Sequence, residues 1–447
     1  MLGYEEEQRS LTKEQKQAVG ILSIGTFLEY FDLYLYVHMS VLLNELFFPE
    51  ADPHTANLYT AAAFCSTFVF RPIGALLFGW IGDNIGRKST VIITTMLMAI
   101  SCFLMANLKT YAELGELATW LMISCRIVQG MSSMGEVIGA DIYLTESIKP
   151  PIQYPAVATL DSCCILGGFG ALCMASLVTS FGFSWRIAFL IGAGIALVGA
   201  VARTALRETP EFIDAKRQLE TILEQANIDG KEIESLPLYK EKTNKKTVLA
   251  FFLLDCAGPI AFYASYIYCS NILKDSFGYS PEQIIHQNLF VAAVELFGAF
   301  VLIYLSRKIY PLKILKIKLV IFTAFILIFP YLLFKVNTPF QVFLIQGYIM
   351  LFGCFMSPAF PIFCKHLPIF KRFTYASFSF ALSRAMMFII TSFGTIYLTK
   401  YLGHWGLLVI LIPVTLGFGF GVYYFEKLEK EVGNYPRDLF EIDPVMA

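Results

Sequence analysis

Acidic and basic residues stand inside the long apolar runs of this 447-residue sequence, where a charge is unfavourable. Each costs on the order of 3 kcal/mol at the centre of a membrane helix unless it faces a cavity or a partner. The helical rise places six of them roughly 12–22 Å deep in a core about 30 Å thick. The six are Glu29, Asp32, Arg126, Asp255, Glu295 and Arg384. A static ion pair can explain any one of them, but charges of both signs at one depth favour a water-filled pathway.

The residues suited to proton transfer begin with Glu29 and Asp32, which are three apart and share one face of the first predicted helix. Two close carboxylates cannot both ionise cheaply in a low dielectric, so one is expected to bind and release a proton. Local pairing of Glu29 with a neighbouring helix is the alternative. Glu136 lies beyond Arg126, about 15 Å further along its helix. It is expected to be a second proton site or the partner of an inner gate.

The residues suited to binding a small molecule carry charge or an aromatic ring. Arg126 cannot usefully deprotonate, so it is expected to hold a carboxylate of the protein or of a substrate. Tyr30 and Tyr34 flank the first-helix carboxylates and can contact a quaternary ammonium group. Asp161 precedes a glycine-rich stretch and is either a pathway residue or a structural partner, whereas Arg384 would suit an anion. The binding candidates are Arg126, Tyr30, Tyr34, Asp161, Arg384 and Glu295.

The elements that must position these residues are membrane helices. A hydrophobic content of 56% and a mean hydropathy of +0.61 exceed what a water-soluble domain of this length can bury. Runs of about 20 apolar residues predict an all-α protein with twelve transmembrane helices. The first six lie at about 17–44, 58–80, 88–106, 116–140, 154–180 and 185–206. The second six lie at about 247–273, 283–305, 314–334, 338–362, 375–400 and 402–425, and the one containing Gly353 and Pro358 is expected to be kinked.

The predicted organisation is two six-helix bundles, 17–206 and 247–425, joined by a charged linker at 207–246. Residues 1–16 form an N-terminal segment and residues 426–447 form a tail in this prediction. Most of the 34 lysines and arginines fall on the side of the termini, so the positive-inside rule places both termini in the cytoplasm. Repeated bundles of this kind hold their substrate near the midplane, between the halves.

Several function classes find no support in the sequence. The ten cysteines are scattered without metal-ligand spacing, so neither a metal site nor another cofactor is expected. A net charge of −1 without a basic stripe argues against nucleic-acid binding. The lack of a phosphate-binding Gly-Lys-Ser/Thr loop and of a catalytic constellation argues against an ATP-driven pump and an enzyme. Single charges of mixed sign argue against a channel built from rings of like residues.

Four motifs in the first half of the sequence carry a family resemblance. They are Leu28-Glu29-Tyr30-Phe31-Asp32, then Arg71-Pro72-Ile73-Gly74-Ala75, then the loop with Gly79, Asp83, Gly86, Arg87 and Lys88, and finally Arg207-Glu208-Thr209-Pro210-Glu211-Phe212. On these residues the sequence resembles the metabolite:proton symporter family of the major facilitator superfamily, and its proline/betaine transporters most of all. The second half resembles the family only loosely.

The resemblance implies the major facilitator fold and proton-coupled uptake of a small metabolite by alternating access, with the proton as the coupling ion. Its proline/betaine branch implies a zwitterionic solute such as proline or betaine. Uptake of an organic carboxylate is the alternative, and a non-transporting receptor is a third interpretation. We also expect a monomer in the bacterial inner membrane, with lipid and a small-molecule substrate as its partners. The residues predicted to gate the conformational change are Arg71, Gly79, Asp83, Gly86, Arg87 and Lys88.

Overall fold

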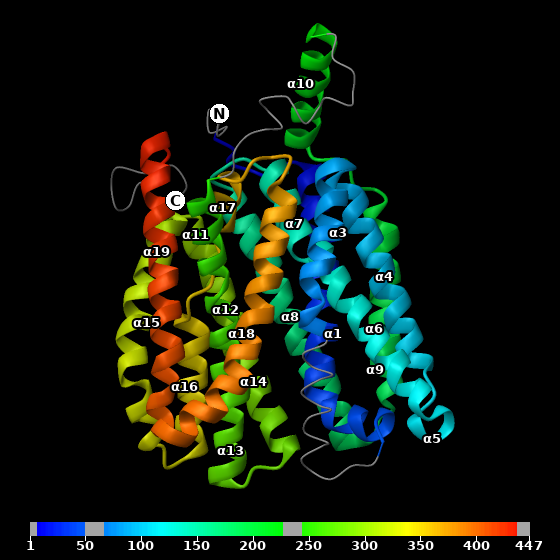
Figure 1. Cartoon of the computed structure of the whole chain (residues 1–447), viewed down its shortest axis with the longest axis vertical. Helices are drawn as coiled ribbons and strands as arrows, with labels where there is room; N and C mark the ends of the chain where they lie inside the picture. The colour runs from blue at the N-terminus through cyan, green and yellow to red at the C-terminus, as the bar shows by residue number, and fades with distance from the viewer. Residues whose placement is uncertain (1–6, 50–66, 227–243, 436–447) are drawn as a thin grey trace.

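The computed structural model describes residues 7–49, 67–226 and 244–435, which are almost entirely helical and contain no β-strand. The helices of the first half are α1 (Lys13–Phe47), α3 (Arg71–Asn84), α4 (Arg87–Asn107), α5 (Tyr111–Leu114), α6 (Glu116–Glu136), α7 (Ile138–Ser147), α8 (Gln153–Phe181) and α9 (Trp185–Arg203). A further helix, α10 (Pro210–Ala226), projects beyond the ends of the others (Figure 1). It forms most of the described part of the segment predicted to be a linker.

The second half begins with an interrupted helix made of α11 (Lys245–Asp255), α12 (Ala257–Phe262), the π-helix η2 (Tyr263–Tyr268) and α13 (Cys269–Phe277). It continues through α14 (Pro281–Ser306), α15 (Pro311–Phe334), α16 (Pro339–Phe352), α17 (Phe360–Lys365), α18 (Arg372–Leu402), the 3₁₀ turn η3 (Gly403–Leu407) and α19 (Leu408–Val432). The two halves stand side by side with their long helices roughly upright (Figure 1).

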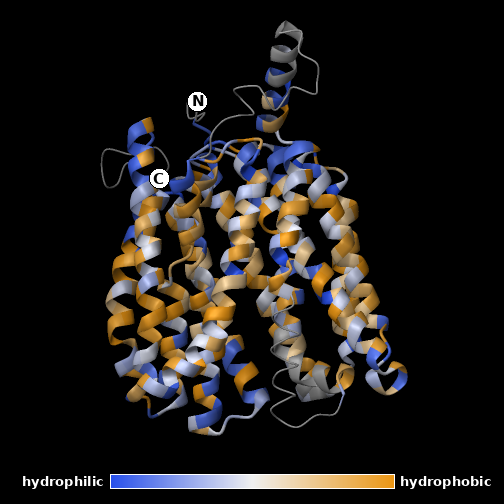
Figure 2. Cartoon of the chain, in the orientation of Figure 1, coloured by the Kyte–Doolittle hydropathy of each residue, from blue (hydrophilic) through white to orange (hydrophobic). Residues whose placement is uncertain are grey.

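The outside of the helices is apolar, as a surface solvated by lipid must be. Eight helical segments of the described chain are long and apolar enough to cross a membrane, and the last of them, Arg372–Val432, contains both α18 and α19. Large apolar side chains such as Phe297 and Val320 are about two thirds exposed, at 67% and 66%. Hydrophobic residues dominate the shafts of the helices, and hydrophilic residues gather at the end from which α10 projects (Figure 2).

Three of the predicted spans are interrupted within their length. α11 stops at Asp255, because Pro259 has no N–H to donate to the carbonyl four residues earlier. α16 stops at Phe352, so the expected kink is a complete break that runs to the start of α17. The fourth predicted span divides at Val137 into α6 and α7. Irregular backbone at membrane depth is tolerated only where it is buried in protein or lines a cavity, so these breaks mark the place to look for a site.

The two halves meet through α8 against α14 and through α3 against α18. Small residues allow the second approach. A Cβ atom on Gly79 would lie 2.8 Å from the Cα of Thr374, and one on Gly82 would lie 2.5 Å from the ring of Phe373. Neither glycine can gain a side chain while α3 and α18 keep this separation.

Candidate functional site

A cavity of about 220 Å³ lies between the two halves. Each of the three helix interruptions contributes to its wall, so the breaks do line a cavity. The contributing residues are Val137 and Ile138 beside the first break, Gly258 and Pro259 beside the second, and Phe355, Met356 and Ser357 within the third. Discontinuous helices around a central cavity are a recurring way for secondary transporters to build a substrate site.

Charged residues of both signs line this cavity in the described part of the chain. They are Arg71, Asp141, Asp161, Asp255, Glu295, Lys318 and Arg384. The helical rise places them roughly 9–20 Å from the helix ends on the side where α10 lies. Buried charges at that depth need partners, so the contacts of each decide what the cavity can bind.

Two ion pairs on the first-half side are closed and buried. Arg71 Nη2 lies 2.8 Å from Glu29 Oε1, and both side chains are almost fully buried. Arg126 Nη1 lies 2.9 Å from Asp32 Oδ2 and also donates to Gln129 Oε1 at 2.9 Å. Among these carboxylates and guanidinium groups, only Arg71 belongs to the cavity wall.

Contacts on the second-half side are looser. The hydroxyl of Tyr266 donates to Glu295 Oε2 at 2.8 Å. Arg384 Nη1 lies 3.8 Å from Asp255 Oδ1, and its guanidinium carbon lies 3.1 Å from the centre of the Phe380 ring. Lys318 Nζ lies 5.4 Å from the centre of the Phe355 ring. This side of the cavity therefore holds charges that are not locked in tight pairs.

Aromatic rings from both halves close one wall. The ring centre of Tyr34 lies 5.3 Å from that of Phe262 and 5.9 Å from that of Tyr266, both in edge-to-face geometry. Tyr30 lies one turn earlier on the same helix and also lines the cavity. Rings arranged in this way offer their π-faces and edges to a small cation or an apolar ring.

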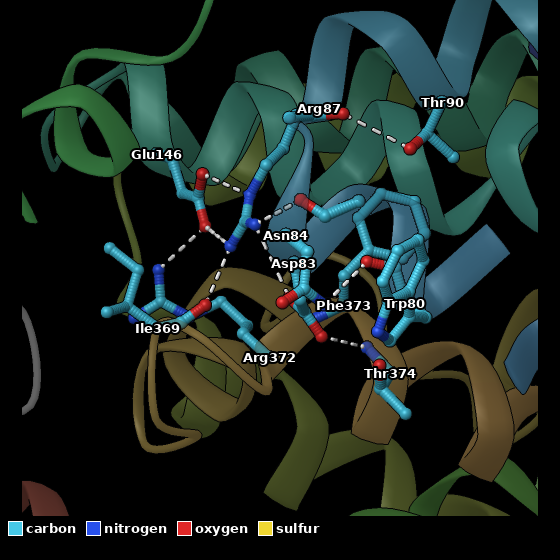
Figure 3. Close-up of polar contacts among 12 residues, drawn as sticks. Trp80, Asp83, Asn84, Arg87, Thr90, Glu146, Ile369, Arg372, Phe373 and Thr374 are labelled. Carbon is cyan, nitrogen blue, oxygen red and sulfur yellow. Dashed lines mark hydrogen bonds and ion pairs between the residues drawn. The ribbon is translucent and has the colours of Figure 1, made fainter. Parts of the chain in front are cut away.

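A polar network joins the halves at the α10 end, and we call its members Asp83, Arg87, Glu146 and Arg372 the inner network. Arg87 donates to both oxygens of Glu146 at 3.0 Å, and Arg372 Nη1 lies 3.0 Å from Glu146 Oε1 (Figure 3). Asp83 accepts the backbone N–H groups of Phe373 and Thr374 at 3.0 and 2.9 Å. The network thus caps the start of α18 with a residue from the other half.

The electrostatics of the inner network favour the ionised carboxylate. Burial alone would raise the pKa of Glu146. The guanidinium groups of Arg87 and Arg372 outweigh this effect and hold that pKa below its ordinary value. Thr209 also donates to Glu146 Oε2 at 2.7 Å. Glu146 is therefore a permanently charged tie between the halves near neutral pH.

The predicted gating residues divide between the inner network and the cavity. Gly79, Asp83 and Arg87 lie where α3 and α4 meet α18, and Gly86 has a φ of 146° that suits glycine. The backbone N–H of Lys88 donates to Glu208 at 3.2 Å. Arg71 instead lies at the cavity, 12 residues and roughly 18 Å before Asp83 along α3.

The predicted binding and proton residues also divide. Those on the cavity wall are Tyr30, Tyr34, Asp161, Glu295 and Arg384. Glu29, Asp32 and Arg126 lie behind the wall in the two closed pairs. Glu136 ends α6, and its side chain falls outside what the structure describes.

Sequence reasoning missed two charged wall residues, Asp141 and Lys318. Asp141 lies one residue beyond the predicted end of the fourth span, although apolar residues flank it on both sides. Lys318 lies near the start of an apolar run, where lysine usually reaches back to the membrane surface. The apolar neighbours of each residue were the signal that could have found it.

Comparison with known proteins identifies the family of this chain. The model of the Major Facilitator Superfamily matches residues 22–372. The chain belongs to this superfamily. The protein is therefore an integral membrane protein, and its family and curated relatives are transporters rather than enzymes.

The curated relatives of this major facilitator protein are bacterial transporters. It is 30% identical over 295 residues to the proline/betaine transporter of Salmonella typhimurium, a match covering 64% of this chain and 58% of that protein. It is 34% identical over 231 residues to the inner membrane metabolite transport protein YhjE of Escherichia coli, covering 49% and 52%. The chain thus spans little more than half the length of the curated relatives it matches.

Solved structures show the same fold at lower identity. The proton:xylose symporter XylE bound to 6-bromo-6-deoxy-D-glucose aligns with a TM-score of 0.71 and 15% identity, covering 93% of this chain and 95% of that chain. The partially occluded inward-open form of XylE from E. coli aligns with a TM-score of 0.65 and 16% identity, covering 91% and 97%. The predicted major facilitator fold is confirmed.

Proposed function

We propose that this chain is a proton-coupled symporter that imports a small zwitterionic solute such as proline or betaine by alternating access. The observation that carries the proposal is the cavity between the halves, lined by charges of both signs and by aromatic rings. The names of the relatives, among them a glycine betaine/proline/ectoine/pipecolic acid transporter of Dickeya dadantii, 29% identical over 295 residues, support this substrate class.

The balance of charge on the wall supports a zwitterion over a carboxylate with several negative charges. Four acids and three bases line the cavity in the described chain, so a polyanionic metabolite would meet a surplus of like charge. A zwitterion has a group for each sign and adds no net charge to a site of low dielectric.

The proton step is assigned in this proposal to the pair of Asp32 and Arg126. Protonation of Asp32 would leave the buried Arg126 without its counter-charge, and losing one partner of a buried pair costs about 3–5 kcal/mol. That cost favours a conformation in which Arg126 reaches water or another acid. Asp32 sits on α1 between Tyr30 and Tyr34, which line the cavity, so a change at the pair moves the substrate wall.

The proposed topology has twelve membrane spans, both termini in the cytoplasm, and the inner network on the cytoplasmic side. It places the chain in the bacterial inner membrane as a monomer, with no cofactor besides the coupling proton. The excess of Lys and Arg in segments on the α10 side supports this orientation.

Uptake into proteoliposomes tests the function. With an acidic outside and an alkaline lumen, we expect accumulation of labelled proline or betaine that collapses when a protonophore is added. Asp32→Asn is expected to abolish accumulation and keep exchange of substrate across the membrane, because exchange needs no net proton movement. Asp32→Glu is the matched control and should accumulate substrate. Full accumulation by Asp32→Asn would exclude Asp32 as the proton carrier, and uptake that ignores the pH gradient would exclude a proton symporter.

A further inference from the structure

Two buried carboxylates on the cavity wall each keep one oxygen without a hydrogen-bond donor. They are Asp141 Oδ1 on α7 and Asp255 Oδ2 on α11, and both residues are only 6% exposed. One belongs to each half of the chain. A buried acceptor left without a donor costs about 1–3 kcal/mol, so a ligand that brought donors to these two oxygens would remove that cost.

The surroundings make this end of the cavity strongly acidic. Asp141, Asp161 and Asp255 all line the cavity, and Asp141 interacts electrostatically with the other two, so carboxylates from both halves share this end of the cavity. The closest approach of the Arg384 guanidinium group to Asp255 is 3.8 Å. One guanidinium group at that distance cannot neutralise three carboxylates. We call Asp141, Asp161 and Asp255 the acidic end.

A second part of the wall presents a single free cation. Lys318 is 7% exposed, and its ammonium group makes no hydrogen bond or ion pair with any part of the chain that the structure describes. Its neighbours are the ring of Phe355 and the carboxylate of Glu295, which already accepts the Tyr266 hydroxyl. Arg71 and Arg384, the other cations of the described wall, lie beside Glu29 and Asp255.

We propose that the cavity binds its zwitterion in one orientation, with the carboxylate on Lys318 and an ammonium group that carries N–H donors on Asp141 and Asp255. This inference rests on the proposed function and adds the residues and the kind of cation. Charge-assisted hydrogen bonds are stronger than neutral ones, so both ends contribute to affinity.

The proposal separates two kinds of zwitterion. A secondary ammonium, as in proline, can donate to the free oxygens of Asp141 and Asp255. The quaternary ammonium of betaine has no N–H and leaves both oxygens without donors, although the rings of Tyr34 and Phe262 can still attract it. The wild-type protein should therefore bind proline more tightly than glycine betaine.

Binding to the purified full-length protein, measured by calorimetry at about pH 7, tests the assignment with three probes. L-proline carries both groups, glycine betaine lacks N–H, and prolinamide lacks the carboxylate. Lys318→Met is expected to weaken the binding of proline and betaine by roughly 10- to 100-fold and to leave the affinity for prolinamide unchanged. Asp141→Asn is expected to weaken the binding of proline and prolinamide by about tenfold or more. The affinity for betaine should stay within about threefold of the wild-type value.

Lys316→Met is the matched control, because Lys316 lies on the same helix but pairs with Glu426 at 3.0 Å and lies off the cavity wall. It should leave all three affinities unchanged, and thermal unfolding should show that each variant is folded. Unchanged proline affinity in Lys318→Met would overturn this inference and leave the proposed function standing.

Equal losses for proline and betaine in Asp141→Asn, together with a flattened pH dependence of binding, would also overturn it, because the acids would then bind protons. A wild-type protein that binds neither zwitterion would overturn the proposed substrate class as well.

Discussion

Replacing Asp83 tests how strongly the inner network holds the two halves together. Its carboxylate accepts the N–H groups of Phe373 and Thr374 at 3.0 and 2.9 Å and lies 3.3 Å from Arg87 Nη1. N–H groups in the first turn of α18 have no acceptor within the helix, and the positive end of the helix dipole faces the carboxylate. Loss of such a cap costs about 0.5–2 kcal/mol.

Asp83→Ala removes both acceptors and the contact with Arg87, so we take the upper figure of about 2 kcal/mol. Since 1.4 kcal/mol is a factor of ten, the equilibrium between joined and separated halves should shift by about 30-fold. Asp83→Asn keeps one carbonyl oxygen and loses the charge. It should cost about half as much, which corresponds to a shift of about fivefold.

Hydrogen–deuterium exchange of the peptide at the start of α18 measures this directly, because exchange requires the capped N–H groups to be released. Exchange is expected to be fastest in Asp83→Ala, slower in Asp83→Asn and slowest in the wild type. Asn84→Ala is the matched control, because Asn84 is exposed and its side chain donates to the Trp80 carbonyl on its own helix at 2.9 Å. If this peptide exchanged as slowly in Asp83→Ala as in the wild type, Asp83 would not hold the start of α18 in place.

Two further predictions concern the same interface. Gly79→Ala would place a Cβ 2.8 Å from the Cα of Thr374, a backbone atom that cannot rotate away, so the same peptide should exchange faster by an amount equivalent to about 1–3 kcal/mol. Because Arg87 and Arg372 hold the pKa of Glu146 below its ordinary value against the effect of burial, the stabilisation from this carboxylate is complete above its unfolded pKa of about 4.5. Thermal unfolding should therefore show this contribution unchanged from about pH 8 to 5 and lost as the pH falls through the lowered pKa, a loss that Glu146→Gln should not show.

Part of the charged cavity wall was predictable from the sequence, because a charge inside a long apolar run is unfavourable unless it faces a cavity or a partner. Glu295 and Arg384 were expected near mid-membrane, and both line the cavity. Their roles in binding stay predictions. The motif loop likewise placed Asp83 and Arg87 at a junction between helices, where the structure has them.

The pairing of charges was not predictable, because it depends on how each helix is rotated about its axis. Arg71 and Glu29 are 42 residues apart in sequence, and Arg126 and Asp32 are 94 apart. Periodicity identifies the face that a residue shares with its neighbours on one helix, but it does not identify the helix opposite. Arg126 was therefore open to either a protein carboxylate or a substrate carboxylate, and the structure gives it Asp32.

The cavity and the inner network share rigid elements, which gives a physical route from binding to gating. α7 carries Asp141 on the wall and Glu146 in the network, five residues and roughly 7.5 Å apart. α18 carries Arg384 on the wall and Arg372 in the network. A ligand that draws Asp141 toward Asp255 moves α7, which carries Glu146, and acts on α18 through Arg384, which lies 3.8 Å from Asp255. The contact between Glu146 and Arg372 is therefore expected to change when ligand binds. Coupling of this kind requires an element with two arrangements, and the junction of α7 with α18 is where such an element is to be sought.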